Sequence, residues 1–399
     1  MEPMDFSWRG SADRKMCIEL IMDMALLSTQ KSAAGRRKER KMDGNLREQG
    51  NRNPAVKKDL KSLALEELTT ELKNAGYPKF RAAQLYRWMH VQLAEDFDEM
   101  RNLPAAMRDD LRGQYSMTRL KVAERQISKL DGTQKFLFEL PDGETVESVF
   151  MRYKFGNSIC VSSQVGCRMG CRFCASTLDG LKRNLLPGEI LEEIYSIRRI
   201  TGEKVSHVVV MGTGEPLDNY DHLLTFLRIL TDENGQNLSM RNVTVSTCGI
   251  VPRIHELAKE NLSITLALSL HATSDEKRRQ IMPIAERYSI AECMAACKDY
   301  FDRTGRRVTF EYSLIKDVND GEREAEDLAR LAKEVHAHVN LIPVNPVKER
   351  NYLQPELSAV QAFGRKLEKH GINVSIRRVL GRDIDGACGQ LRHRHIRER

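Results

Sequence analysis

The sequence predicts an α/β protein: a partial (β/α)6 barrel, preceded by a small helical domain and a short antiparallel β layer. Three observations support this fold class: short β-rich runs that alternate with longer helical ones after residue 158, leucines at helical spacing from residue 60, and two Asp-Gly turns between residues 118 and 153. Six strand–helix repeats imply a parallel sheet with helices outside it. Only about 220 residues remain for them, and a closed eight-fold barrel usually takes about 250, so an open barrel fits better.

Composition narrows the class of protein. The chain has 399 residues, 41% of them hydrophobic and 30% charged, which is typical of a globular protein. No apolar run reaches the roughly 18 residues that a membrane span needs, because the best candidate, residues 16–27, is interrupted by Glu19 and Asp23. A secretory signal is not expected either. We therefore predict a cytoplasmic protein without a membrane partner.

The net charge of +7 is concentrated in one stretch of the chain. Between residues 31 and 58 there are ten basic residues and three acidic ones, a surplus equal to the net charge of the whole protein. The remainder of the chain is therefore neutral in sum. Because a polar basic stretch is more often a solvated tail than a phosphate contact, composition alone predicts no RNA binding for the folded part.

The first half of the chain divides into three parts. Residues 1–56 join a short amphipathic stretch to the basic run, and we predict a disordered extension, with Met42 as an alternative start. Apolar residues then recur at helical spacing, which predicts a helical domain over residues 57–117. Residues 118–157 alternate apolar and polar side chains around the two Asp-Gly turns, which predicts an antiparallel β connector.

Residues 158–392 are predicted to form the barrel, and residues 393–399 a basic tail. The expected parallel strands are residues 159–162, 207–211, 243–246, 264–270, 308–314 and 338–342. Ligands of such a sheet lie at the carboxyl ends of its strands, so the catalytic and ligand-binding residues are expected there.

Three cysteines stand on one short loop after the first of these strands, in Cys167-Arg-Met-Gly-Cys171-Arg-Phe-Cys174. Nine cysteines in so long a chain predict no dense disulfide framework, and three within eight residues indicate a metal or cluster site in a reducing compartment. Three thiolates can hold a cubane iron–sulfur cluster with one iron left open, whereas structural zinc takes four ligands. The alternative is a zinc site with Cys160 or His207 as the fourth ligand.

Polar residues follow the later strands. Gly214 and Glu215, in Gly212-Thr-Gly-Glu-Pro216, form a turn with one carboxylate, which suits a cationic amino group. Ser246, Ser269, His271 and Asn345 stand at the ends of three further strands, where a core would take apolar residues. Each alone is more often a turn or cap residue than a ligand, but together they predict one polar mouth.

Two cysteines outside the loop, Cys160 and Cys388, are either reactive thiols or ordinary buried side chains. Cys388 lies in a glycine-flanked, irregular segment, where it is an approachable thiol, and Cys160 lies on the first strand, seven residues before Cys167. Taken alone, either is more often a small buried hydrophobe. Cys293 and Cys297 are four apart on a predicted helix and are expected in the core.

The C-x3-C-x2-C loop resembles that of the radical S-adenosylmethionine superfamily, and the rest of the chain resembles the RlmN family within it. The motifs are residues 160–167 (Cys-Val-Ser-Ser-Gln-Val-Gly-Cys), 181–185, 214–216 (Gly-Glu-Pro), 269–271 (Ser-Leu-His), 340–345 and 387–391 (Ala-Cys-Gly-Gln-Leu). The resemblance covers roughly residues 57–392. It departs from the family pattern at Cys248 and Gly386, where the family more often has serine and alanine.

The resemblance implies the cofactors and the reaction. A [4Fe-4S] cluster would be held by Cys167, Cys171 and Cys174, and S-adenosylmethionine would contact residues 214–215, Ser246, residues 269–271 including Leu270, and Asn345. The family methylates C2 of adenosine in 23S rRNA and in certain tRNAs, which would make residues 57–117 an RNA-binding domain. It further implies flavodoxin as electron donor, and a monomer is the default expectation.

The resemblance also implies catalytic roles for three residues. Cys388 would take a methyl group from one S-adenosylmethionine, and a radical made from a second molecule would activate that methyl to add to C2. Glu147 would accept the C2 proton, and Cys160 would release the RNA by forming a transient disulfide with Cys388. Without the resemblance, Glu147 on an alternating strand is by default a solvent-facing carboxylate.

Two other functions remain open at this point. The related Cfr-type enzymes use the same parts to methylate C8 of a ribosomal adenosine. A second alternative is an RNA-binding protein that holds an iron–sulfur or zinc centre without catalysis, which predicts that the protein tolerates Cys388→Ser.

Overall fold

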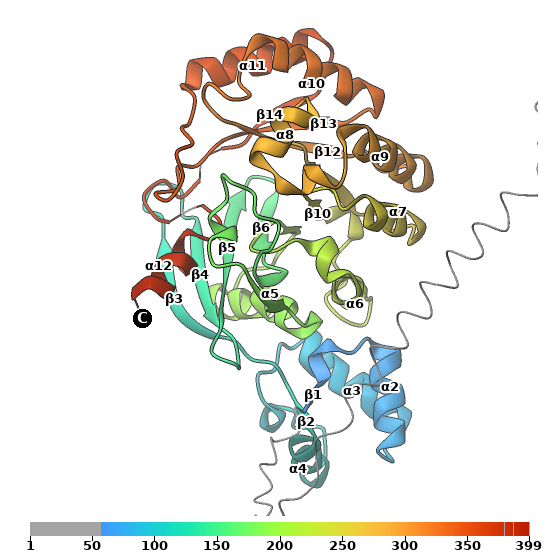
Figure 1. Cartoon of the computed structure of the whole chain (residues 1–399). Helices are drawn as coiled ribbons and strands as arrows, with labels where there is room; N and C mark the ends of the chain where they lie inside the picture. Colours follow the sequence, from blue (N-terminus) through green and yellow to red (C-terminus); the bar gives the residue numbers. More distant parts are fainter. Residues whose placement is uncertain (1–56, 379, 386, 399) are drawn as a thin grey trace, which may run out of the picture. The chain divides into compact units, whose positions relative to one another are not determined.

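The computed structural model describes residues 57–378, 380–385 and 387–398 (Figure 1). The predicted extension of residues 1–56, with its part of the basic run, lies outside the described residues, as does Gly386. Over the described ranges, the helices are all too short or too polar to cross a membrane.

Residues 57–116 form the helical part that the leucine spacing predicts. Its elements are β1 (Lys58–Asp59), η1 (Leu60–Ser62), α2 (Leu65–Asn74), α3 (Lys79–His90), η2 (Phe97–Glu99), α4 (Ala105–Gln114) and β2 (Tyr115–Ser116). Leu68 and Leu72, one turn apart on α2, are fully buried, as is Leu85 on α3. This spacing places them on one face of each helix, so that the short helices share one apolar core.

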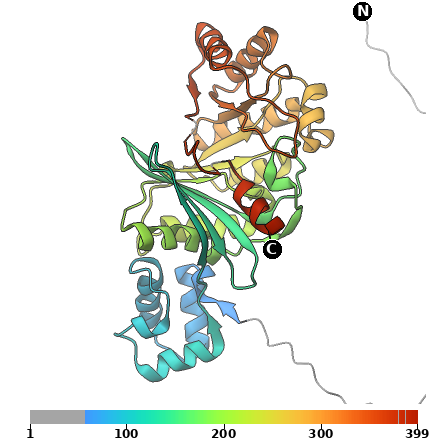
Figure 2. The ribbon, with the colours of Figure 1, turned by 90° about the vertical axis from the view of Figure 1, so that its left-hand side faces the viewer.

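A ten-stranded sheet follows, in the order β14-β13-β12-β11-β10-β9-β6-β5-β4-β3. The strands are β3 (Lys121–Ile127), β4 (Gln134–Glu139), β5 (Thr145–Tyr153), β6 (Gly156–Val161), β9 (His207–Val210), β10 (Val243–Thr247), β11 (Thr265–Ser269), β12 (Thr309–Leu314), β13 (His338–Pro343) and β14 (Val374–Ile376). Strand β6 pairs antiparallel with β5 and parallel with β9. The predicted antiparallel layer is therefore one edge of the same sheet, not a separate layer (Figure 2).

The six predicted parallel strands are all present, and helices connect them. These are α5 (Pro187–Thr201), α6 (Tyr220–Thr231), α7 (Val251–Lys259), α8 (Asp275–Ile281), α9 (Ile290–Thr304), α10 (Glu322–Glu334) and α11 (Leu357–Lys369), with short 3-10 turns at η3 (Ala175–Thr177), η4 (Pro216–Asn219), η5 (Met240–Asn242) and η6 (Pro283–Glu286). Cys293 and Cys297 on α9 are fully buried in the core, as predicted.

Two of the elements that were not predicted lie next to the candidate site. The three-residue strand β14 extends the parallel sheet beyond β13, and its length is too short for a sequence pattern to reveal. The helix α12 (Gln390–Glu398) takes up residues expected as irregular segment and basic tail. The backbone N–H groups of Gly389 and Arg392 donate to the Glu147 carboxylate, at 2.7 and 2.6 Å. A distant carboxylate thus caps the start of this helix, which local sequence does not show.

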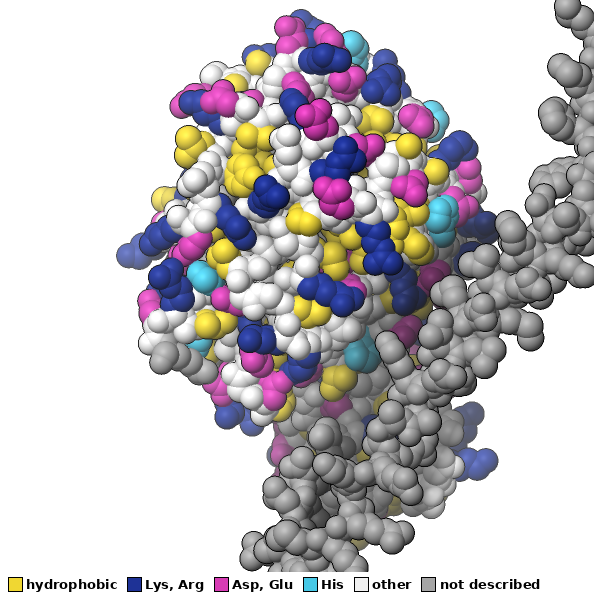
Figure 3. Space-filling model, viewed as in Figure 1, with side chains coloured by type: hydrophobic (Ala, Val, Ile, Leu, Met, Phe, Trp, Pro, Cys, Tyr) yellow, Lys and Arg dark blue, Asp and Glu magenta, His cyan; other side chains and the backbone are white. Residues whose placement is uncertain are grey.

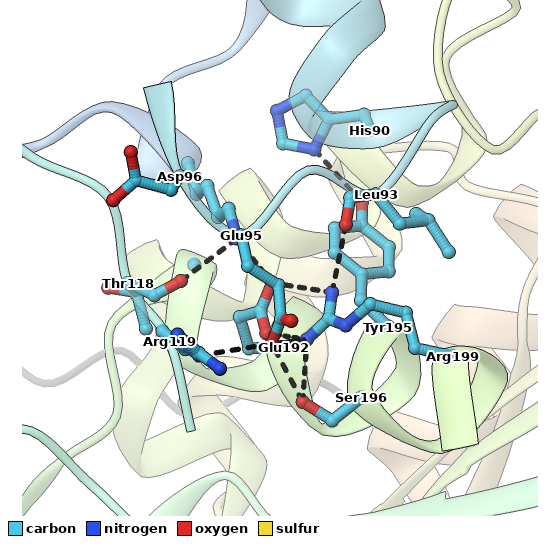
Figure 4. Close-up of polar contacts among 12 residues, drawn as sticks. His90, Leu93, Glu95, Asp96, Thr118, Arg119, Glu192, Tyr195, Ser196 and Arg199 are labelled. Carbon is cyan, nitrogen blue, oxygen red and sulfur yellow. Dashed lines mark hydrogen bonds and ion pairs between the residues drawn. The ribbon is translucent and has the colours of Figure 1, made fainter. Parts of the chain in front are cut away.

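The helical part is attached to α5 by a buried polar network. Lys61 forms an ion pair with Glu192 of α5, and both side chains are fully buried. Arg199 donates to the same carboxylate at 2.7 Å and to Ser196 at 2.9 Å (Figure 4). The Nδ1 atom of His90 lies 2.9 Å from the Tyr195 hydroxyl. Because every charge is paired, this network fixes α5 against the N-terminal helices.

The surface mixes charges of both signs. On the face drawn in Figure 3, Lys and Arg side chains alternate with Asp and Glu side chains, and many of the ion pairs, such as Lys298 with Asp302 on α9, link neighbouring turns of one helix. This agrees with the neutral sum of charge outside the basic stretch.

Candidate active site

The carboxyl ends of the parallel strands open into two cavities that share part of their lining. The smaller has a volume of about 230 Å³ and the larger about 800 Å³. The linings share Ile342, Asn345, Arg377, Ala387 and Cys388. Cys388 therefore lies where the two cavities meet.

The three loop cysteines face the smaller cavity. Their loop closes on itself through a 3.1 Å hydrogen bond from Cys167 N to the Gly180 carbonyl. The strand pair β7 (Gln164–Gly166) and β8 (Leu181–Asn184) frames it. Gly166 has φ +77°, and a Cβ there would lie 1.8 Å from the Gly180 carbonyl oxygen, so only glycine fits.

The three thiols fit an iron–sulfur cluster. Cys167, Cys171 and Cys174 are free of disulfides and all line the same cavity. Thiol groups around a cavity supply the ligand type that such clusters take. Burial raises the pKa of the Cys167 thiol to about 12, so a cationic centre is what would hold it as a thiolate.

Cys160 and His207, the alternatives for a fourth zinc ligand, do not line the smaller cavity. Cys160 lines the larger cavity, and His207 begins β9, at the opposite end of that strand from the cluster loop. Among the residues with described positions, no three Cys, His, Asp or Glu side chains are placed to hold a single metal ion.

Glu215 lies on the wall of the smaller cavity, next to Gly214. Its carboxylate accepts hydrogen bonds from Cys248 N at 2.7 Å and Leu217 N at 3.1 Å. Each oxygen keeps a further lone pair for a donor in the cavity. Burial raises the pKa of Glu215, and a cationic amino group beside it would favour the charged form.

The strand-end residues converge as predicted. Ser246, Ser269, His271 and Asn345 all line the smaller cavity, and the Ser246 and Ser269 hydroxyl oxygens lie 3.3 Å apart. His271 Nδ1 accepts from Ser313 N at 2.9 Å, which leaves its Nε2 as a donor. Burial lowers the pKa of His271 to about 3, so the ring is neutral at pH 7.

Leu270, predicted with them, is placed differently. Its side chain is fully buried in the core and is not part of the cavity lining. Ser269 is the last residue of β11, and the backbone turns just after it, with φ +56° at His271. The side chains of Ser269 and His271 line the cavity, and that of Leu270 does not. Its carbonyl oxygen accepts from Arg278, whose fully buried guanidinium also donates to the Cys248 and Ser269 carbonyls. Arg278 thus ties together the strand ends that carry the polar mouth.

The two outlying cysteines meet. Cys160 and Cys388 both line the larger cavity, and a hydrogen bond between their thiols holds the pKa of Cys388 down to about 6. Arg377 and Lys135 lower it further through their charges. The same hydrogen bond, with burial, raises the pKa of Cys160 well above its usual value. Cys388 is therefore the thiolate of this pair at neutral pH.

Glu147 is buried, contrary to the solvent-facing default for its strand. It is 3% exposed, and its carboxylate holds the Gly389 and Arg392 amides on both sides of the turn that follows Cys388. The Lys135 ammonium lies 3.0 Å from it. Its side chain is not among those that line either cavity.

Lys135 and Arg377 belong to the site but were missed from the sequence. The Lys135 ammonium donates to the carbonyls of Asp385 and Ala387, at 2.6 and 2.5 Å, so it anchors the segment that carries Cys388. In an alternating strand a lysine is normally taken to face solvent. Arg377 follows the short strand β14, and no pattern marked that strand.

Comparison with known proteins places these features in two sequence families. The radical SAM superfamily profile matches residues 161–332, and that of the ribosomal RNA large subunit methyltransferase N-terminal domain matches residues 58–116. The first match includes the three cysteines of the loop and the polar strand ends up to His271.

Relatives match over most of their length. A probable dual-specificity RNA methyltransferase RlmN from Lachnospira eligens is 58% identical over 85% of this chain and 97% of its own. The same-named protein of Clostridium botulinum (strain Alaska E43) is 50% identical over 85% and 98%. A crystal structure of a radical SAM methyltransferase from Sphaerobacter thermophilus superposes with a TM-score of 0.80 at 42% identity, covering 84% of this chain and 98% of that one.

Proposed function

The chain belongs to the RlmN family of radical S-adenosylmethionine RNA methyltransferases, and on that premise we propose that it methylates C2 of adenosine in 23S rRNA and in tRNAs. As in its superfamily, the enzyme uses a [4Fe-4S] cluster and S-adenosylmethionine. The observation that carries the proposal is the position of Cys388, which lines both cavities and faces the Cys160 thiol.

Cys388 is the proposed methyl carrier. Its thiolate attacks the methyl group of one S-adenosylmethionine, so a new S–C bond forms on Cys388 and S-adenosylhomocysteine leaves. The lowered pKa supports this role, because the thiolate is the nucleophilic form. When bound at Cys167, Cys171 and Cys174, the cluster would supply the electron for reductive cleavage of a second S-adenosylmethionine. Cys388 would hold its methyl group where the product of that cleavage can remove a hydrogen atom.

The S-adenosylmethionine site is proposed at the smaller cavity. Cys167, Cys171 and Cys174 hold the cluster, and Glu215 receives the amino group. The other contacts come from Gly214, Ser246, Ser269, His271 and Asn345, and from Leu270 only through its backbone. The shared cavity wall supports this assignment, because Cys388 also lines the smaller cavity.

Two further groups finish the reaction. Once the carbon on Cys388 has bonded to C2, Glu147 is proposed to accept the C2 proton. It holds the backbone of Gly389, so it moves with the turn that carries Cys388. The unpaired electron of the adduct would return to the cluster that supplied it. The Cys160 thiolate then attacks the Cys388 sulfur, so the S–S bond forms as the S–C bond breaks, and the electron pair left on carbon takes up a proton to complete the methyl group and release the RNA. A thiol reductant restores the two thiols.

The remaining roles follow from the family. We propose that residues 57–117 contact the RNA, that flavodoxin donates the electrons, and that the enzyme acts as a monomer in the cytoplasm.

The decisive experiment analyses nucleosides by mass spectrometry in a strain that lacks this activity. Restoring the gene should produce 2-methyladenosine in both 23S rRNA and tRNA, and Cys388→Ser should abolish it. Cys297→Ala, a change at a buried cysteine of α9 that faces neither cavity, is the control and should keep the product. Formation of 8-methyladenosine would assign the C8 reaction instead, and a chain with an intact cluster that gives neither product would favour the non-catalytic RNA-binding alternative.

A further inference from the structure

The larger cavity carries more positive charge than the proposed chemistry uses. Arg378 and Arg382 line it together with Arg377, the charge that already lowers the pKa of Cys388, and all three lie in the segment that runs from β14 to Cys388. Within the described residues, none of their guanidinium groups forms an ion pair or donates a hydrogen bond, although most arginines of this chain do. Unpaired guanidinium groups around a cavity favour an anionic ligand, and their planar fork suits phosphate oxygens.

The same cavity has an aromatic wall. Tyr153, the last residue of β5, lines it, and the Phe155 ring stacks on the Tyr153 ring with centroids 4.9 Å apart and an interplanar angle of 7°. The edge of His207 packs against Phe155, at 5.2 Å and 83°. Phe155 is not part of the cavity lining, and its ring packs on one face of the Tyr153 ring. This contact holds the Tyr153 ring in place.

Phe155 contributes little to the core. It lies in the turn between β5 and β6 and is 67% exposed, at a position where a polar residue is the ordinary choice. An exposed aromatic ring that backs a second ring beside unpaired arginines has the composition of a single-stranded nucleic acid site, where bases stack on rings and cations hold the phosphates.

The pairing of β5 with β6 shows how far the Tyr153 ring lies from the two thiols. Val149, Met151 and Tyr153 are alternate residues of β5 that all line the cavity, and Val149 pairs with Cys160. Tyr153 is four residues beyond Val149 on β5. At about 3.3 Å per residue, it lies about 13 Å along the strand from the point where Val149 pairs with Cys160. A base in contact with the two thiols therefore leaves room on Tyr153 for a neighbouring base.

We propose that Tyr153, backed by Phe155, is a stacking platform for an unpaired base that flanks the target adenosine, and that Arg378 and Arg382 bind the phosphates on either side of it. This inference rests on the proposed function, because it takes RNA as the substrate. It goes further in assigning positioning residues for the neighbouring nucleotide.

The test measures the binding of an unmodified, fluorescently labelled tRNA transcript to the cluster-loaded enzyme at several KCl concentrations. Tyr153→Leu should weaken binding about 5- to 150-fold, the range for loss of one base–ring stack. Tyr153→Phe keeps the ring and should restore most of the affinity, while Phe155→Leu should fall between them. Arg382→Gln should lower the slope of log affinity against log salt by about one unit, while Tyr153→Leu leaves the slope unchanged.

Phe301→Leu is the matched control. Phe301 on α9 also packs against a histidine, His336, at 6.0 Å, but it lines neither cavity. Binding of radiolabelled S-adenosylmethionine should be the same in all variants. Unchanged RNA affinity in Tyr153→Leu, or an equal loss in Phe301→Leu, overturns the platform.

The outcomes separate this inference from the proposed function. If the unaltered enzyme methylates RNA and Tyr153→Leu binds and methylates it equally well, the platform is wrong and the function stands. If RNA binding depends on the Tyr153 ring but no methyladenosine forms, the function is wrong and the platform stands. An unaltered, cluster-loaded enzyme that binds no RNA overturns both.

Discussion

Cys388 and Cys160 are chemically identical side chains that the fold makes unequal. Cys388 receives the hydrogen bond from Cys160 and lies near Arg377 and Lys135, whereas Cys160 is fully enclosed at the end of β6. A methyl acceptor must be a thiolate at the start of the cycle, and a resolving thiol is needed only at its end. The direction of both pKa shifts matches this division of labour.

Alkylation of Cys388 should reveal its lowered pKa. In protein whose Cys388 carries no methyl group, we expect the rate of reaction with iodoacetamide to rise with pH, with its midpoint at about pH 6, because only the thiolate reacts. Cys160→Ala removes the largest cause of the low pKa, so the midpoint should move up toward the usual range of a thiol. The readout is mass spectrometry of the peptide that contains Cys388, and a midpoint unmoved by Cys160→Ala would contradict the assigned cause.

The proposed resolving role of Cys160 has a separate signature. Cys160→Ala should trap a covalent adduct of protein and RNA, because the thiol that is proposed to break the bond between Cys388 and the nucleotide is gone. Denaturing electrophoresis with labelled RNA detects the adduct, and Cys160→Ala with Cys388→Ser should not form it. Clean release of methylated RNA by Cys160→Ala would show that Cys160 is structural.

At the scale of elements, the segment around Cys388 is held by its partners in strands β4 and β5 and not by its own sequence. Lys135 binds two carbonyls on one side of Cys388, and Glu147 binds two amides on the other. The two side chains also form an ion pair. One buried pair therefore sets the position of the reactive sulfur and the start of α12.

Lys135→Met should loosen this segment. It leaves the Glu147 carboxylate buried without its cation, a loss that typically costs about 3–5 kcal/mol. We expect faster hydrogen–deuterium exchange over residues 383–392 and a large fall in methylation rate. Lys121→Met on β3 is the control, since that lysine is 81% exposed in its ion pair with Glu139 and exchange should not change. Protection equal to that of the unaltered enzyme would rule out the anchoring role.

The contact between the N-terminal helices and α5 depends on another buried lysine. Lys61→Met should destabilise the N-terminal part by about 3 kcal/mol, toward the low end for a broken buried pair because Arg199 still neutralises Glu192. Lys58→Met, which breaks an exposed pair with Glu71, should cost less than about 1 kcal/mol. Urea unfolding of a chain that begins at Lys57, followed by Trp88 fluorescence, measures the free energy of unfolding of both variants. An equal loss of stability in the two would contradict the role given to burial.

At the scale of the whole molecule, the described residues that line the two cavities and form the cluster loop come from Thr133 onward. We therefore expect a chain that begins at Lys57 to methylate RNA about as well as the full chain, with the same dependence on salt. Steady-state kinetics with tRNA at low and physiological salt check this. A loss of kcat/KM for RNA that is largest at low salt and shrinks as salt rises would show that residues 1–56 contact RNA.

Residues whose chemistry is local could be predicted from the sequence, and those whose role depends on distant partners could not. The cysteine loop and the polar strand ends follow from spacing and from the rule that ligands gather at the carboxyl ends of parallel strands. Leu270 stands between two residues that line the cavity, but its side chain is buried in the core, which the Ser-Leu-His motif alone does not show. Lys135 and Arg377 were missed because their partners lie about 250 and about 10 residues away in the chain. The helix and strand periods that guide sequence analysis do not relate residues so far apart.

The position of Cys388 in the wall common to both cavities has a consequence for the order of events. A sulfur that belongs to two linings can be loaded from one side and discharged on the other, so the two reactants need never occupy the same space. Spent cofactor can leave the smaller cavity while the nucleotide stays in the larger. If Cys388 is the methyl carrier that we propose, its methylation needs only the smaller cavity and does not depend on bound RNA.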